Sequence, residues 1–168
     1  MSTLLLYLYL ALIVGPTSRF RVCSASAEGL QLLRERRPAV HSYWFEGIFA
    51  VLFFYREKKT QILLTPSAKS DIFSRIAVLF RIPIAKGMIE SGGRNAMQIL
   101  IQKLQNGSPV LVSGDGSRGP EKSFKTNPLL IAQKSGVPVL PIGIRFSSSF
   151  HMNFDGANVR IPMPFCLL

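Results

Sequence analysis

The chain has 168 residues and a formal net charge of +11, from 20 lysines and arginines against 9 aspartates and glutamates. This length suits one domain with its own core, and the positions of Cys23 and Cys166 near opposite ends argue against a disulfide framework or a zinc site. The charge favours anionic partners, such as a membrane surface or a phosphorylated substrate. No nucleic acid is expected, because no RNA- or DNA-binding signature accompanies the charge.

The first 22 residues contain an apolar run from Leu4 to Val14. This run is too short for a membrane-spanning helix, which needs ~20 residues. It predicts an N-terminal apolar helix, for which we consider two interpretations that do not exclude each other. The helix is an interfacial anchor, in which Arg19 and Arg21 meet anionic head groups, or a core helix that packs on the domain, or both. We therefore divide the chain into a membrane-associating segment, residues 1–22, and one α/β domain, residues 23–168.

From residue 38 onward, short apolar runs alternate with helical patterns. The predicted strands cover residues 38–43, 61–64, 82–85, 110–113 and 137–144. The predicted helices cover residues 45–55, a segment that begins at Ser70-Asp71, a segment from Ser91 to just before Gly107, and a segment from Asn127-Pro128 to Gly136. This alternation predicts the α/β class, with a largely parallel sheet flanked by helices.

The segment VLVSGDGSRGP, Val110 to Pro120, places a glycine-rich, charged loop directly after a buried strand. In open α/β sheets, ligands bind beyond the carboxyl ends of the strands, so this loop is the first candidate site. Backbone amides from Gly114 to Ser117 can form an anion-binding concavity, and Arg118 adds a planar fork suited to phosphate.

Three other residues of the loop region carry separate expectations. Gly116, like Gly114, lets the backbone take unusual conformations and approach a ligand. Asp115 is expected either to fix the loop by accepting backbone hydrogen bonds or to orient the arginine. A second glycine-plus-arginine group, SGGR, ends at Arg94 beside the start of a predicted helix, which is itself an anion site.

Several segments together carry a resemblance to a known family: residues 38–44 (PAVHSYW), 86–94 (KG and SGGR at its two ends), 114–120 (GDGSRGP), 132–143 (AQKSGVPVLPIG) and 160–165 (RIPMPF). In this order and spacing they resemble the bacterial lysophospholipid-acyltransferase-like proteins of the DUF374 type. The resemblance implies an acyltransferase-like αβ sandwich docked on a membrane. It also suggests that the chain is shortened at its C-terminus, because the family usually continues past the closing motif.

The resemblance also implies an activity: transfer of a fatty acyl group to a hydroxyl of a phosphate-bearing lysolipid or glycolipid. The acyl donor would be acyl-CoA or acyl carrier protein, with no metal and no tightly held cofactor. The partners would be an anionic lipid or lysolipid and the membrane surface, on the cytoplasmic face of a bacterial inner membrane. The loop at residues 114–118 corresponds to the family's phosphate-binding loop, with Arg94 assisting.

The general base is where the sequence departs from the family. The family's histidine directly follows a tryptophan, but here Trp44 is followed by Phe45, which cannot accept a proton. A second register pairs His41 with Glu46, in the spacing His, four residues, acid, which resembles the wider superfamily's motif. His41 is then either the base oriented by Glu46 or a hydrogen-bonded strand residue without a catalytic role.

Two functional hypotheses follow. The first is a membrane-associated acyltransferase in which His41 and Glu46 act as base and orienting acid, while the loop and Arg94 bind phosphate. The second is a catalytically inactive acyltransferase-like protein that binds lipid or phosphate groups and has lost the base.

Overall fold

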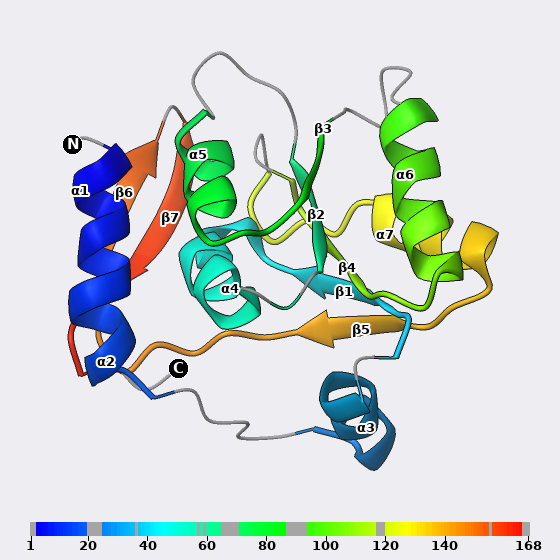
Figure 1. The fold of residues 1–168 in the computed structure, drawn as a ribbon, viewed down its shortest axis with the longest axis horizontal. Helices are drawn as coiled ribbons and strands as arrows, with labels where there is room; N and C mark the ends of the chain where they lie inside the picture. Colours follow the sequence, from blue (N-terminus) through cyan, green and yellow to red (C-terminus); the bar gives the residue numbers. More distant parts are fainter. Residues whose placement is uncertain are drawn as a thin grey trace.

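The computed structural model describes residues 3–19, 25–35, 37–56, 58, 60–64, 71–86, 94–116, 120–154 and 156–165, without the side chains of Asp71 and Arg94. It has the α/β architecture, with a five-stranded parallel sheet and helices on both faces (Figure 1). The strand order is β3-β2-β4-β1-β5. A separate antiparallel hairpin, β6 and β7, follows the sheet.

The strands of the sheet are β1 (Val40–Tyr43), β2 (Gln61–Leu64), β3 (Ile84–Lys86), β4 (Val110–Ser113) and β5 (Val139–Ile142). The hairpin pairs β6 (Ser149–Phe154) with β7 (Ala157–Pro162). The helices are α1 (Thr3–Leu8), the π-helix η1 (Tyr9–Val14), α2 (Gly15–Thr17), α3 (Ala27–Glu35), the 3-10 turn η2 (Phe45–Gly47), α4 (Ile48–Tyr55), α5 (Asp71–Leu79), α6 (Arg94–Gln105) and α7 (Asn127–Ser135).

The predicted order of strands and helices from residue 38 onward is confirmed, with strands 61–64 and 110–113 at the predicted residues. Helix α7 also ends as predicted, because Gly136 adopts a left-handed φ of 66° and its N–H caps the helix. The sequence analysis missed α3 and the hairpin. The dipeptide Asp155-Gly156, flanked by alternating apolar residues, was an available hairpin signal.

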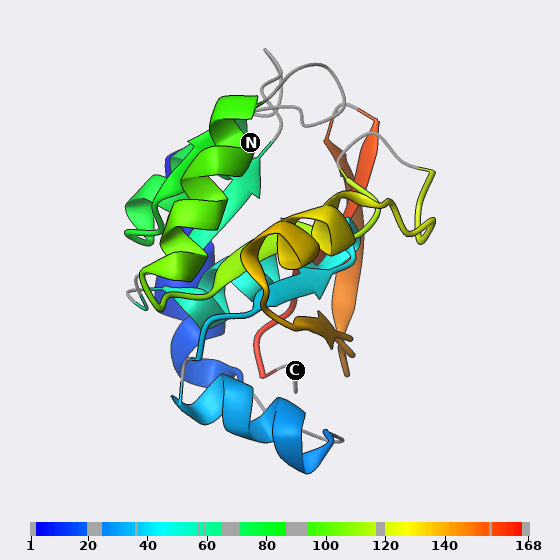
Figure 2. The ribbon, with the colours of Figure 1, turned by 90° about the vertical axis from the view of Figure 1, so that its right-hand side faces the viewer.

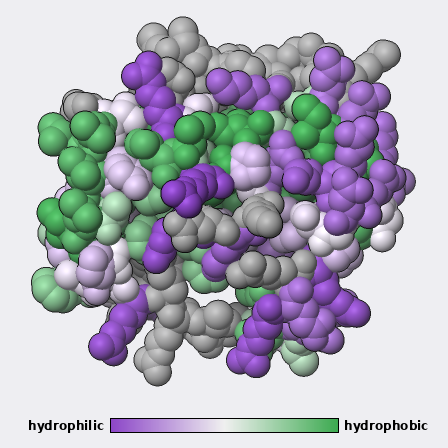
Figure 3. Space-filling model, in the orientation of Figure 1, coloured by the Kyte–Doolittle hydropathy of each residue, from purple (hydrophilic) through white to green (hydrophobic). Residues whose placement is uncertain are grey.

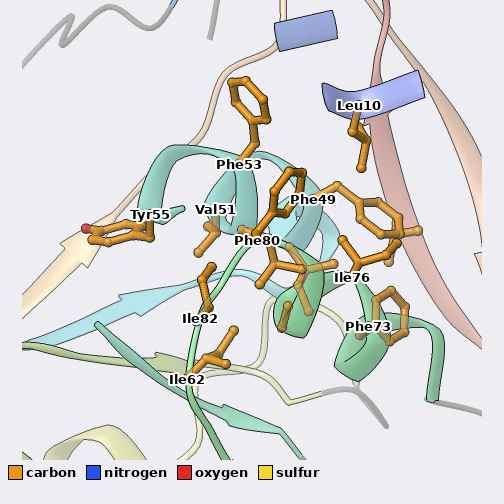
Figure 4. Packing of buried hydrophobic residues seen from close by; sticks show 14 of the residues in the cluster. Leu10, Phe49, Val51, Phe53, Tyr55, Ile62, Phe73, Ile76, Phe80 and Ile82 are labelled. Atoms are coloured by element: carbon orange, nitrogen blue, oxygen red, sulfur yellow. The ribbon is translucent and has the colours of Figure 1, made fainter. Parts of the chain in front are cut away.

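Side-chain alternation along the central strands divides the core into two layers. Val110 and Val112 of β4 face α6 and α7, whereas Leu111, between them, faces α4 and α5. Figure 2 shows α6 and α7 on the near side of the sheet. The layer on the far side is rich in aromatic residues. Phe73 of α5 packs at a tilt against Phe49 (Figure 4). Phe73 also packs edge-on against Phe45.

The N-terminal apolar segment is helical and packs on this aromatic layer. Leu6, Leu10 and Val14 are fully buried and lie four residues apart. A spacing of four exceeds the 3.6 residues of an α-helical turn, and the π-helical stretch η1 keeps the three side chains on one face. The Tyr9 hydroxyl donates to the Pro162 carbonyl oxygen at 3.0 Å and fixes the segment to β7.

The opposite face of the same segment is apolar and exposed. Leu5 and Leu12 are 61% and 67% accessible, and Leu4, Leu8 and Ile13 are exposed as well. Figure 3 shows hydrophobic side chains gathered over the side of the molecule that carries α1. No helix among the described residues has the length and apolar character needed to cross a bilayer. The burial of Leu6, Leu10 and Val14 confirms that this segment packs on the domain. Its role as an interfacial anchor stays a prediction.

Candidate functional site

The glycine loop begins at the carboxyl edge of the two central strands, β1 and β4. The Gly114 N–H donates to the Tyr43 carbonyl oxygen at 2.8 Å, and the Gly114 carbonyl oxygen accepts from the Lys125 N–H at 2.7 Å. A side chain at Gly114 would be crowded, because its Cβ would lie 3.0 Å from the Phe124 ring and 3.3 Å from Ser42 Oγ. The chain therefore passes the ends of both strands closely, as an anion-binding loop requires.

The Asp115 carboxylate organises the loop from inside. It is buried and accepts three hydrogen bonds: from the Phe45 N–H at 2.9 Å, from Ser113 Oγ at 2.8 Å and from the Lys122 N–H at 3.0 Å. Asp115 thus fixes the loop backbone, which was one of its two predicted roles. The acceptor positions are occupied by the protein itself, so Asp115 holds the loop in shape.

Two residues of the loop region adopt left-handed backbone conformations. Gly116 has a φ of 71°, and its N–H donates to Ser113 Oγ at 3.0 Å. Lys122 has a φ of 57°, which is uncommon for a residue with a side chain. Its N–H is the one bound by Asp115, so the carboxylate offsets the backbone strain where the loop returns to the body of the domain.

The predicted phosphate ligands Ser117 and Arg118 lie outside the described residues, as do Ser91, Gly92 and Gly93. Arg94 begins α6, and its side chain is not described. Their predicted roles as anion ligands stay predictions. Within the described ranges, no group of three or more His, Cys, Asp or Glu side chains is placed to hold a metal ion.

Two lysines that the sequence analysis did not single out approach the loop. A Cβ on Gly116 would lie 3.4 Å from Lys125 Nζ, so this ammonium group sits against the loop backbone. Lys122 Nζ lies 3.5 Å from Glu46 Oε1. Both belong to the segment EKSFK, residues 121–125, and two cations in the return of a glycine loop were the signal available in the sequence. Lys125 brings a positive charge to the loop, whereas the charge of Lys122 is paired with that of Glu46.

The structure does not form the predicted pair of His41 and Glu46, and this is a correction to the sequence analysis. His41 is buried, and its Nδ1 lies 2.6 Å from the Tyr55 hydroxyl, while its Nε2 has no partner among the described residues. Glu46 lies in η2 and pairs with Lys122. The physical reason is the strand: His41 is the second residue of β1, so its side chain leaves the sheet two residues before the carboxyl end.

His41 faces a cavity at the opposite edge of the sheet. The cavity is also lined by Thr60 and Pro109, which directly precede β2 and β4 and so mark the amino edge. Burial, with the positive charge of Lys58 as a smaller cause, lowers the pKa of His41 from 6.5 to about 4. The imidazole is therefore neutral near pH 7. The other histidine, His151, lies exposed on β6.

Phe45 occupies the position where the family resemblance expects the base. Its ring is buried and packs edge-on against Phe73 at 5.2 Å between ring centroids, while its N–H is bound by Asp115. Behind it, Tyr43 is buried with no hydrogen-bond partner for its hydroxyl among the described residues. Burial, and next the Asp115 carboxylate, raise the pKa of Tyr43 well above 10, so this phenol keeps its proton. The described part of the carboxyl edge thus offers the cation of Lys125 but no imidazole, and the N–H groups of Gly114 and Gly116, predicted to bind an anion, already donate within the protein.

Comparisons with known proteins give one distant relative and no family. No family model matches the chain. The uncharacterized protein RP090 of Rickettsia prowazekii (strain Madrid E) is 22% identical over 164 residues, which is 97% of this chain and 74% of that protein. The similarity extends along nearly the whole chain and says nothing of activity.

Replacing the organising carboxylate tests the loop geometry. Asp115→Ala leaves the buried N–H group of Phe45 and the partly buried N–H group of Lys122 without acceptors, so we expect the free energy of unfolding to fall by about 3 kcal/mol. Urea denaturation followed by circular dichroism measures the change. Glu121→Ala, which removes an exposed carboxylate from the same loop region, is the matched control and should change stability by less than about 1 kcal/mol. Equal effects of the two variants would contradict the role given to Asp115.

The buried imidazole predicts a pH dependence of stability. Its pKa is lower in the folded chain than in the unfolded one, so between pH 6.5 and about 4 the unfolded chain binds more protons. The stability contributed by neutral His41 is full above pH 6.5 and is lost as the pH falls through this window, by up to about 3 kcal/mol.

Denaturation of the wild type and of His41→Gln at pH 7 and pH 4.5 measures this dependence. The variant should lose less stability than the wild type on acidification, while His151→Gln should behave as the wild type does. Parallel losses in all three proteins would rule out the buried neutral state of His41.

Proposed function

We propose that this chain is a membrane-associated, non-catalytic protein of the acyltransferase-like type, which binds the phosphate group of an anionic lipid or lysolipid at its glycine loop. The observation that carries the proposal is the state of Phe45. Its backbone is held by Asp115 at the loop, and its buried ring takes the place of a base. The alternative hypothesis, a catalytically active acyltransferase, needs His41 beside the loop. In the structure His41 is instead hydrogen-bonded to Tyr55 at the amino edge of the sheet.

The charge around the loop supports an anionic ligand. Lys122 and Lys125 approach the loop from its return segment, and the chain as a whole carries a net charge of +11. The N–H groups of Gly114 and Gly116 donate within the protein, so hydrogen bonds to phosphate oxygens would come from Ser117 and Arg118, as the sequence predicts. The buried Asp115 carboxylate carries a negative charge that opposes an anion at the loop, so Lys125 and, as the sequence predicts, Arg118 have to outweigh it.

The N-terminal helix supports the membrane as the source of this anion. Its exposed leucines form an apolar face, suited to lie in the interfacial layer of a bilayer. Strand β7 links this helix to the loop region: Pro162 bonds to Tyr9, and Asn158 Nδ2 donates to Glu121 Oε1 at 2.7 Å. Asn158 and Pro162 are about 13 Å apart along β7, and we propose that the helix and the loop meet the same membrane surface. By resemblance, that surface is the cytoplasmic face of a bacterial inner membrane.

Binding to vesicles tests the proposal. The purified chain should co-sediment with phosphatidylcholine vesicles that contain lysophosphatidic acid more strongly than with phosphatidylcholine alone. Arg118→Ala should weaken binding to the anionic vesicles about tenfold, because it removes a charge-assisted contact to phosphate. Lys134→Ala, which removes an equal charge from the exposed last turn of α7, is the matched control and should weaken binding less.

A second variant separates the helix from the loop. Leu12→Glu places a charge on the exposed face of η1 and should lower binding to both kinds of vesicle, without changing the folded structure. If Arg118→Ala and Lys134→Ala weaken binding equally, the ligand is held by net charge alone and the loop is not the site. If neither vesicle binds the wild type, the membrane role fails.

A further inference from the structure

A cavity of about 170 Å³ lies at the amino edge of the sheet, away from the glycine loop. Its buried lining is polar and includes His41, Tyr55 and Thr60. Its outer lining carries two cations: Arg34 from the last turn of α3 and Lys58 from the segment after α4. Polar groups inside an otherwise apolar wall are the usual composition of a small-ligand site.

The hydrogen bond between Tyr55 and His41 fixes which imidazole nitrogen carries the proton. Burial raises the pKa of Tyr55 well above 10, so the phenol keeps its proton and can donate it to His41 Nδ1 over 2.6 Å. A phenol is a better donor than acceptor, and we therefore assign the remaining imidazole proton to Nε2. This buried N–H has no acceptor among the described residues, and an unpaired buried donor costs about 1–3 kcal/mol.

The charges around the cavity favour an anionic ligand. Lys58 Nζ lies over the Phe54 ring, 3.4 Å from its centroid, and 5.4 Å from the centroid of the Tyr55 ring, so its ammonium group is held beside the cavity. Arg34 is the second cation of the lining. Among the described residues that line the cavity, none is acidic. An anion inside would lie near both cations and beside the His41 imidazole.

We propose that this cavity binds a small oxyanion, a phosphate or a short-chain carboxylate, through His41, Lys58 and Arg34. The volume corresponds to roughly five or six water molecules, which suits inorganic phosphate or a carboxylate of a few carbons and is too small for a lipid. Phe54 and Leu33 in the wall favour a ligand with an apolar part behind its charged group. The site is distinct from the glycine loop and does not depend on the lipid-binding proposal.

Nuclear magnetic resonance of the imidazole nitrogens tests the site directly, because the chain has only two histidines. Inorganic phosphate and sodium butyrate are titrated separately at constant ionic strength. The His41 resonances should shift saturably with at least one of them, with a dissociation constant of about 1 mM, while those of the exposed His151 should not. The two titrations show whether the phosphate or the carboxylate is preferred.

Charge-removing variants locate the binding. Lys58→Met and Arg34→Met should each raise the dissociation constant about tenfold, whereas Lys134→Met should leave it unchanged. The unperturbed His41 spectrum of each variant, taken before titration, shows that the Tyr55 hydrogen bond is intact. The proposal is overturned if His41 does not respond to either anion, if both histidines shift alike, or if Lys58→Met and Lys134→Met bind equally well.

Discussion

One buried carboxylate, that of Asp115, holds together the parts of the molecule on which any function at the loop depends. It accepts hydrogen bonds from Phe45, the second residue after β1, from the last residue of β4 and from the return of the loop. Phe45 is 70 residues away in sequence, so the carboxylate ties the end of β1 to the loop that follows β4. The energy of three satisfied donors also offsets the left-handed backbone at Lys122. A loop constrained in this way is preorganised for a ligand.

The same hydrogen bonds separate the shape of the site from its chemistry. Phe45 gives its N–H to Asp115, and its ring packs into the aromatic layer beside Phe73. Any residue type except proline would supply that N–H, so the loop geometry does not require a histidine there. Proton abstraction does require one, or another base in its place. A chain can therefore keep an anion-binding loop after losing the base, which is the condition that our proposal describes.

Much of the fold could be predicted from the sequence, because apolar runs and helix signals are local. The strand 110–113 and the helix that ends at Gly136 depend on short-range patterns and were placed at the observed residues. The hairpin was missed because Asp155-Gly156 was not weighed against the strand pattern around it. Helix α3 was missed as well, although its segment is as amphipathic as those of α5 and α6. Its contact with Leu140 of β5 depends on tertiary structure and is not visible in the sequence.

The candidate site was predicted less well, because side-chain partners depend on tertiary structure. The spacing of His41 and Glu46 fits a known motif, yet their partners are Tyr55 and Lys122. A helix that started just after His41 would have brought it close to Glu46. His41 is instead the second of the four residues of β1, which places it near the amino edge of the sheet. The loop at Gly114 was recognisable because glycines, a charge and a preceding strand are adjacent in the sequence. Lys122 and Lys125 became relevant only once the loop's return was seen.

The most direct test of the central claim is one reaction in which binding and chemistry are measured together. Excess purified protein is mixed with vesicles containing lysophosphatidic acid and with a long-chain acyl-CoA or acylated carrier protein, and both bound lysolipid and acylated product are quantified by mass spectrometry. The account predicts saturable binding of the lysolipid and no product above the protein-free control. Product that forms with the wild type and disappears with His41→Ala would contradict it and restore His41 as a catalytic base.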